Sequence, residues 1–383
     1  MPANKMIYLD NAATTKPYPE VLDLFVQDNE SLFANSNSPH RAGQDAAKAL
    51  RKAKEEILSL LGLSSSAYSV LLCSGATEAN NLALKGVAFQ YASRGKKIIS
   101  DLGEHSSVKG PLKQLKETFG YDVTMLPIKE DGKVDPKSLE EAIDKQTILV
   151  SIMGVNNEVG SINDIASLAK IVHSYPKAFL HVDATQAIGK IDLPYDQADL
   201  ISFSAHKFGG LKGNGCLICK KTMKLFPQNA GGSQEDGLRS GTVDVPGALG
   251  MALALKKTIQ SQKEHLAIAK ALKEHLIQGL IKTNEVVFNS PEDAIPTLLN
   301  FSLLHKKASV VVEALSEKGI YVSSHSACDE KLDHGSPVLL AMGKKEELAK
   351  NAIRISFSSR TTIEEIDGFL AAFIAIIQEV RDR

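Results

Sequence analysis

The feature that most constrains the fold is a regular alternation of short apolar runs and helical segments between about residues 65 and 220. Strands that are apolar throughout are typical of a parallel sheet covered by helices on both faces. The pattern therefore predicts an α/β fold with a mainly parallel sheet and a ligand crevice at the carboxyl ends of its strands. The expected strands are residues 69–73, 97–100, 123–128, 147–153, 178–182, 200–204 and 216–219.

A second, smaller unit is expected after this sheet. The chain has 383 residues, which is more than one hydrophobic core usually supports. A long polar helix over 247–282 leads to an α+β pattern with strands near Val286, Leu298, Ile320 and Ile353. Its last helix begins at Thr362 and is expected to be capped by Thr361. The other expected helices are residues 46–61, 79–92, 138–143, 165–172, 308–318 and 346–351.

Composition narrows the classes of partner. A net charge of −1 gives no broad attraction to nucleic acid or an anionic membrane, and the longest apolar run, 369–377, is too short to span a bilayer. The N-terminus lacks an apolar signal segment, and four cysteines fit a reducing compartment, so a cytoplasmic location is expected. Cys216 and Cys219 lie three apart in a strand, so their sulfurs should diverge, and no metal site is expected.

Residues 202–210 hold the most informative local pattern, because an apolar strand ends there in Ser204, His206, Lys207 and two glycines. A lysine in an enclosed site can form an imine with an aldehyde such as pyridoxal phosphate. Ser204 and His206 can donate hydrogen bonds to its phosphate. The alternative is a strand end followed by an ordinary glycine turn.

Two further strand ends carry polar groups. Residues 71–81 form a strand, a small-residue turn and a helix start, where backbone N–H groups near Ala76 and the Thr77 hydroxyl can hold a phosphate. Asp183 ends another apolar strand, and a pyridinium nitrogen is a suitable partner for it, with Gln186 near the ring oxygen. An ordinary capped helix and a solvated strand-end aspartate are the alternatives.

Five more residues are candidates. His105, Asn156 and Asn157 follow strands and can contact cofactor or substrate, although His105 is equally consistent with a surface histidine. Arg354 interrupts an alternating strand and can bind a substrate carboxylate, or it is an exposed strand-face arginine. Cys328 lies in a polar segment, where nearby acids disfavour a thiolate and His325 or His334 can support it, so both a reactive and an inert thiol stay open.

Taken together, these segments resemble the cysteine desulfurases, pyridoxal-phosphate enzymes of the class V aminotransferase superfamily. The resemblance runs nearly end to end, and many matches occur in the same order. It implies the type I fold of pyridoxal-phosphate-dependent transferases, with a seven-stranded sheet. The large domain is then expected over 16–258 and the small α+β domain over 1–15 with 259–383. The matching segments are residues 7–15, 73–81, 156–160, 181–186, 202–210, 231–235, 239–242 and 326–328.

The resemblance also implies roles. Lys207 carries the cofactor as a Schiff base, Asp183 pairs with the pyridine nitrogen, Gln186 contacts the ring oxygen and His105 stacks on the ring. Phosphate is held by Ala76, Thr77, Ser204, His206 and, from the neighbouring subunit of a homodimer, Thr242. Arg354 and Asn156 orient the carboxylate of L-cysteine.

The implied reaction yields L-alanine and a persulfide on Cys328, which passes sulfur to an acceptor protein for iron–sulfur clusters, thiolated tRNA or thio-cofactors. The spacing after Cys328 is similar to the long-loop subgroup. Departures include His325 in place of a usual glycine, and Ser233 and Asp236 in place of a common glycine and arginine. Alternatives are a selenocysteine lyase, a cysteine sulfinate desulfinase, a transaminase, or a non-catalytic protein that keeps the fold.

Overall fold

The computed structural model describes residues 6–324 and 335–380, and its centre is a seven-stranded sheet. The strand order is β2-β8-β7-β6-β5-β3-β4, and only β8 runs antiparallel to its neighbours. The mainly parallel sheet predicted from the sequence is therefore confirmed. Its strands are β2 (Tyr68–Cys73), β3 (Lys97–Asp101), β4 (Asp122–Leu126), β5 (Thr147–Met153), β6 (Phe179–Asp183), β7 (Leu200–Ser204) and β8 (Gly215–Lys220).

Helices cover both faces of this sheet because side chains alternate between the faces along each strand. One face packs on α3 (Ala76–Gln90) and α4 (Ser106–Phe119), and the other packs mainly on α2, α5, α6 and α7. Cys216 belongs to the second face and Cys219 to the first, so the predicted divergence of their sulfurs is confirmed. The remaining helices of this unit are α1 (Pro19–Ser31), α2 (Arg41–Leu60), α5 (Pro136–Ala142), α6 (Ile165–His173) and α7 (Val245–Gln260).

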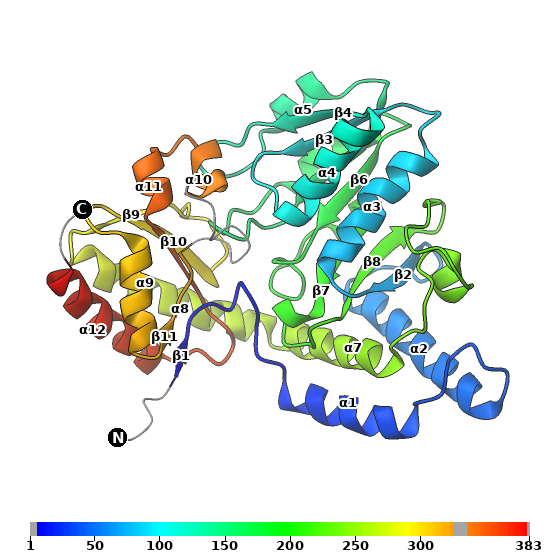
Figure 1. Ribbon diagram of the computed structural model, residues 1–383, viewed down its shortest axis with the longest axis horizontal. Helices are drawn as coiled ribbons and strands as arrows, with labels where there is room; N and C mark the ends of the chain where they lie inside the picture. The colour runs from blue at the N-terminus through cyan, green and yellow to red at the C-terminus, as the bar shows by residue number, and fades with distance from the viewer. Residues whose placement is uncertain (1–5, 325–334, 381–383) are drawn as a thin grey trace.

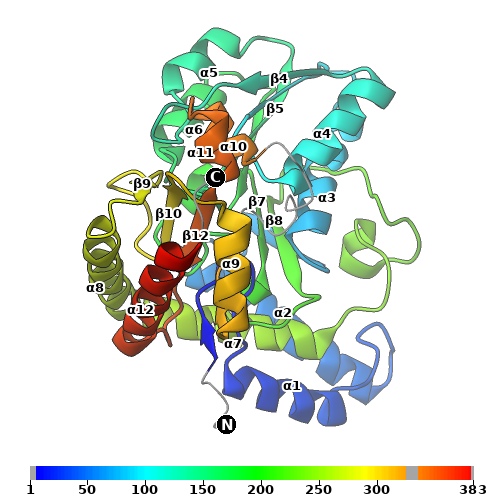
Figure 2. The ribbon, with the colours of Figure 1, turned by 60° about the vertical axis from the view of Figure 1, so that its left-hand side comes forward.

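A smaller α+β unit lies on the left in Figure 1, beside the large sheet. Its three-stranded antiparallel sheet has the order β12-β10-β9, and its core includes Phe301, Phe369 and Phe373, all fully buried. Its elements are α8 (Gln262–Ile281), β9 (Val286–Phe288), β10 (Leu298–Leu303), α9 (Ala308–Glu317), β11 (Ile320–Tyr321), α10 (Pro337–Ala341), α11 (Glu346–Lys350), β12 (Ala352–Ser356) and α12 (Ile363–Glu379). Figure 2 shows α8, α9 and α12 around it.

The start of the chain crosses from the small unit to the large one. Strand β1 (Ile7–Tyr8) pairs in parallel with β11, and Asp10 bridges to Ser356 of β12. Further on, the backbone of Tyr18 bonds to Gly209, next to the end of β7. Residues 9–18 therefore run between the C-terminal sheet and the carboxyl ends of the central strands (Figure 1).

Two predictions about helices are wrong. The predicted helix over 247–282 is two helices, α7 and α8, that meet at Ser261. The Ser261 hydroxyl donates to the carbonyl of Lys257 at 2.8 Å, a bond to the preceding turn that bends helices. The cap of α12 is Thr362, whose hydroxyl accepts from the N–H of Glu365, and not Thr361. Within 6–324 and 335–380, no helix has the length and apolar character needed to cross a membrane.

Candidate active site

A cavity of about 240 Å³ lies at the carboxyl ends of the central strands, where the sequence predicts a ligand crevice. The lining comes from strand ends, from helix starts and from the segment that follows β1. The alternative of a solvated strand-end aspartate is wrong for Asp183, because this residue is only 5% exposed. The lining residues are Ala12, Ala13, Ala76, Thr77, His105, Ser107, Met153, Val155, Asn157, Asp183, Thr185, Gln186, Ser204, His206, Lys207 and Arg354.

One end of the cavity is suited to a phosphate. Helix α3 begins at Ala76, so the partial positive charge of its N-terminus faces the cavity beside Thr77. The Ala76 N–H donates to Ser204 Oγ at 2.7 Å, so the Ser204 hydroxyl can direct its own proton to an anion. Burial, and then the charge of Lys207, lowers the pKa of His206 to about 4, so this imidazole is neutral at pH 7.

Lys207 reaches the cavity from the turn after β7. Its Nζ donates to the carbonyls of Ala12 and Ala13 at 2.7 and 2.8 Å, which the segment after β1 supplies. The turn must end in glycine, because Gly209 has φ +84° and a Cβ there would lie 2.4 Å from the Tyr18 ring. The strand, the turn and the N-terminal segment together position the Lys207 amine.

Asp183 and His105 approach the cavity from the ends of β6 and β3. The Asp183 carboxylate accepts from the N–H of Thr185 at 2.9 Å and from Asn80 Nδ2 at 2.8 Å. His105 caps α4, and its Nδ1 accepts from the N–H of Ser107 at 3.1 Å. A nitrogen that accepts from a backbone N–H carries no proton, so His105 has its proton on Nε2.

Gln186 is next to a second lysine, the half-buried Lys190. The Gln186 Nε2 donates to the Ala12 carbonyl at 2.9 Å, and its Oε1 accepts from Lys190 Nζ at 3.0 Å. Burial, and then the charges of Lys207 and Arg354, lowers the pKa of Lys190 to about 7. The orientation of the Gln186 amide is therefore set by the Ala12 carbonyl and by Lys190.

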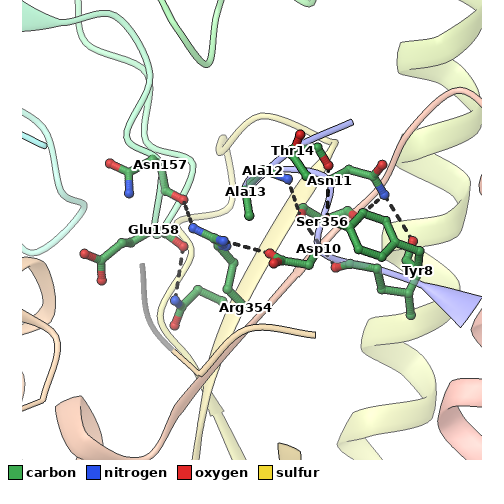
Figure 3. A network of polar contacts seen from close by, with 12 residues as sticks. Tyr8, Asp10, Asn11, Ala12, Ala13, Thr14, Asn157, Glu158, Arg354 and Ser356 are labelled. Carbon is green, nitrogen blue, oxygen red and sulfur yellow. Dashed lines mark hydrogen bonds and ion pairs between the residues drawn. The ribbon is translucent and has the colours of Figure 1, made fainter. Parts of the chain in front are cut away.

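Arg354 lies at the edge of the cavity and is only 2% exposed, so the alternative of an exposed strand-face arginine is wrong. Its Nη2 pairs with Asp10 Oδ1 at 2.8 Å, and its Nη1 donates to the carbonyl of Asn157 at 2.9 Å. Figure 3 shows Arg354 between Asp10, from the N-terminal segment, and Asn157. A buried guanidinium held on two sides in this way presents a fixed positive charge to the cavity.

Three predicted site residues are not brought to the cavity by the described part of the chain. Asn156 is buried behind it, where its Oδ1 accepts from the backbone N–H groups of Glu158 and Val159 at 2.9 and 3.0 Å. Thr242 is exposed and is not among the described lining residues. Cys328 lies outside the described residues.

Sequence reasoning missed several residues that the structure brings to the site. Asp10, Ala12 and Ala13 belong to a segment that was noticed only as part of a resemblance, although it supplies the contacts to Arg354 and Lys207. Asn157 was predicted together with Asn156, and of the two it is Asn157 that lines the cavity. Ser107, two residues after His105, carried no signal beyond its place in a helix cap.

This combination of an α/β sheet, a strand-end lysine, a facing carboxylate and a helix N-terminus is how one large class of enzymes holds pyridoxal phosphate, and the fold and cavity define that class. The family model described as Aminotransferase class-V matches residues 7–369, and the chain belongs to this family. Its members depend on pyridoxal phosphate. The residues here fit that cofactor, with an anion site at Ala76, an amine at Lys207 and a carboxylate at Asp183.

Known proteins are similar over nearly the whole chain. A NifS/IcsS protein homolog of Lactobacillus delbrueckii subsp. bulgaricus is 38% identical and covers 97% of both chains. The cysteine desulfurase IscS of Dictyoglomus turgidum is 37% identical over 98% of this chain and 95% of that one. A solved structure titled NifS-like protein is 36% identical with a TM-score of 0.91, covering 98% of this chain and all of that one. The type I fold is therefore confirmed.

Proposed function

We propose that this chain is a pyridoxal-phosphate-dependent cysteine desulfurase that converts L-cysteine to L-alanine and leaves the sulfur as a persulfide on Cys328. The observation that carries the proposal is the cavity, which brings Lys207, Asp183, His105 and the start of α3 together. Relatives named cysteine desulfurase, similar over nearly the full chain, support the choice of reaction.

When bound, the cofactor withdraws electrons from the Cα of the amino acid, which weakens the bond from Cβ to sulfur. Lys207 would hold the aldehyde carbon of the cofactor, and its amine is placed to move a proton at the substrate Cα. Asp183 would hold the ring nitrogen, Gln186 the ring oxygen, and His105 would support the ring. Ala76, Thr77, Ser204 and His206 would hold the phosphate.

Arg354 binds the carboxylate of L-cysteine, with Asn156 as a second polar group close to that end of the site. The guanidinium, fixed by Asp10 and the Asn157 carbonyl, orients the amino acid with its carboxylate toward Arg354 and its thiol away from it. Cys328 then takes the sulfur, so that the substrate C–S bond breaks and an S–S bond forms. The Cys328 proton passes to the product, so L-cysteine and a thiol give L-alanine and a persulfide without an added oxidant.

The protein works as a homodimer in which Thr242 reaches the phosphate of the neighbouring subunit. Its exposure within a single chain is consistent with that role. The persulfide passes to a sulfur-acceptor protein that serves iron–sulfur clusters, thiolated tRNA or thio-cofactors, in the cytoplasm. We also propose that residues 16–258 form the large domain and that residues 1–15 join 259–383 in the small one.

The test is anaerobic turnover of L-cysteine with a reductant, measuring alanine and sulfide together. The wild type should release equal amounts of both, and Cys328→Ser should release neither. Cys219→Ser is the matched control, because that thiol is buried and lies 3.4 Å from the Ser69 hydroxyl, so a hydroxyl fits in its place. Alanine or pyruvate made by Cys328→Ser would contradict the proposal and indicate a lyase or transaminase.

A further inference from the structure

Asn80 is a buried branch point behind the cavity. It lies in the second turn of α3 and is fully buried, and its amide makes three hydrogen bonds. Its Nδ2 donates to Asp183 Oδ2 at 2.8 Å and to Ser107 Oγ at 2.9 Å, while its Oδ1 accepts from the Ser202 hydroxyl. Because a carboxylate accepts but does not donate, the amide nitrogen must face Asp183.

The direction of every bond behind Asn80 follows from this orientation. The Ser202 hydroxyl gives its proton to Asn80, so His181 Nε2, 3.0 Å from Ser202 Oγ, must be the donor in that pair. His181 Nδ1 then accepts from the Ser151 hydroxyl at 2.8 Å. Burial lowers the pKa of His181 to about 4, which agrees with a neutral ring that carries one proton, on Nε2.

The chain of donors therefore runs one way, from Ser151 through His181 and Ser202 to Asn80, and ends at the Asp183 carboxylate. All its members except Asp183, which lines the cavity, are fully buried. Hydrogen bonds aligned in this way strengthen one another in a low-dielectric interior. A side branch passes through Ser107, whose Oγ lies 2.8 Å from His105 Nδ1.

We propose that Asn80 is a positioning residue for the cofactor, because its amide, oriented by Ser202 and His181, holds the Asp183 carboxylate toward the ring nitrogen and supports His105 through Ser107. The proposal rests on the proposed function for the identity of the ring and deepens it by assigning the support of Asp183. Without the amide donor, the Asp183 carboxylate keeps, among the described residues, only the bond from the Thr185 N–H and can turn from its present orientation. Asn80 is fully buried and is not among the described lining residues, so it acts on the cavity through Asp183 and Ser107.

The first experiment uses the chain without cofactor and asks for the tautomer of His181. Its ring ¹⁵N signals, assigned with His181→Gln, should show the proton on Nε2 in the wild type. In Asn80→Leu the Ser202 hydroxyl loses its acceptor and can donate to His181 Nε2, so the proton should move to Nδ1. The matched control is Asn81→Leu, because Asn81 is half-buried and, within the described residues, its side chain donates to the carbonyl of Thr77 and to no member of the network. Unchanged His181 signals in a folded Asn80→Leu would overturn the proposed orientation.

The second experiment adds pyridoxal phosphate labelled with ¹⁵N in the ring. We expect the ring-nitrogen signal of Asn80→Leu to move toward the unprotonated position and the dissociation constant of the cofactor to rise about tenfold or more. Asn81→Leu should match the wild type in both. If Asn80→Leu does not fold, Ser202→Ala replaces it, because it removes the anchor of Asn80 Oδ1 and should shift both readouts in the same direction.

The two experiments separate the possible failures. A changed His181 tautomer with an unchanged ring signal and dissociation constant would overturn the positioning role, because the network would then not reach the cofactor. A wild type that takes up no pyridoxal phosphate would instead contradict the proposed function, while the His181 signals would still decide the orientation of Asn80. A loss of thermal stability alone, with neither signal moved, would reduce Asn80 to a structural residue and overturn the proposal.

Discussion

The Asp10–Arg354 pair joins the two ends of the chain at the site, and its strength can be worked out from its burial. The two side chains are 17% and 3% exposed, and the contact is 2.8 Å. Removing one partner of a buried pair costs about 3–5 kcal/mol, because the other charge is left without compensation. Asp10→Asn keeps the shape and an acceptor, and Asp10 is partly hydrated, so we expect a loss of about 3 kcal/mol in the free energy of unfolding.

A double-mutant cycle isolates the pair from the other contacts of each residue. Arg354→Met also loses the bond to the Asn157 carbonyl, so its cost includes more than the charge pair. The double variant, Asp10→Asn with Arg354→Met, should cost about 2 kcal/mol less than the sum of the single changes. The control is the same kind of cycle on the ion pair of Lys256 and Glu56, whose side chains are 46% and 41% exposed and whose charged atoms lie 3.1 Å apart. Its coupling energy should be below about 0.5 kcal/mol.

The assay is urea unfolding of the chain without cofactor, so that ligand affinity does not enter the measured free energy. The sequence has eight tyrosines and no tryptophan, so helix circular dichroism is the better signal. Equal, near-zero coupling for the buried and the exposed pair would refute the reasoning, because it would mean that the Asp10 carboxylate does not compensate the Arg354 charge.

Three more predictions concern stability. Burial raises the pKa of Asp101 from 3.8 to about 7, so between these pH values the folded state binds a proton that the unfolded state has lost. The free energy of unfolding should therefore fall as the pH rises from about 4 to about 7. Asp101→Asn should remove the part of this fall that Asp101 causes, as measured by urea unfolding at pH 5 and pH 8. Phe373 is fully buried, and its ring centroid lies 5.5 Å from that of Phe369. Phe373→Ala should lower the free energy of unfolding by about 3–5 kcal/mol, and a loss below about 1 kcal/mol would contradict this. Thr362→Ala should cost about 1 kcal/mol through loss of the capping box with Glu365, whereas Thr362→Ser should keep most of it.

The central strands could be predicted from the sequence because both faces of the sheet are buried. Each such strand is a continuous apolar run, and a run such as Thr147–Met153 has the same bounds in the structure. The break at Ser261 could not be predicted, because it depends on one hydroxyl bond within a pattern that stays helical on both sides. Helix α4 was missed for a related reason, since Gly110 and Pro111 interrupt its pattern although the helix continues.

The residues of the site also differ in whether the sequence could predict them. Groups that follow a strand, such as Lys207 and Asp183, could be predicted because the sheet brings all its strand ends to one edge. Asp10 could not, because its partner is 344 residues away and no local pattern records that distance. Asn80 is the extreme case, since a polar residue inside a helix normally faces solvent, and only the packed structure shows that four elements meet at its amide.

The N-terminal segment contacts both Arg354 and Lys207. The Ser356 hydroxyl of β12 accepts from the Ala12 N–H at 2.8 Å. The carbonyl of Ala12 in turn accepts from both Lys207 and Gln186. Arg354 lies two residues before Ser356 on the same strand. The strand that carries Arg354 therefore also anchors the backbone whose carbonyl accepts from the Lys207 amine. Arg354 and Lys207 lie far apart in the sequence, and their relative position depends on this one N-terminal segment, which contacts both.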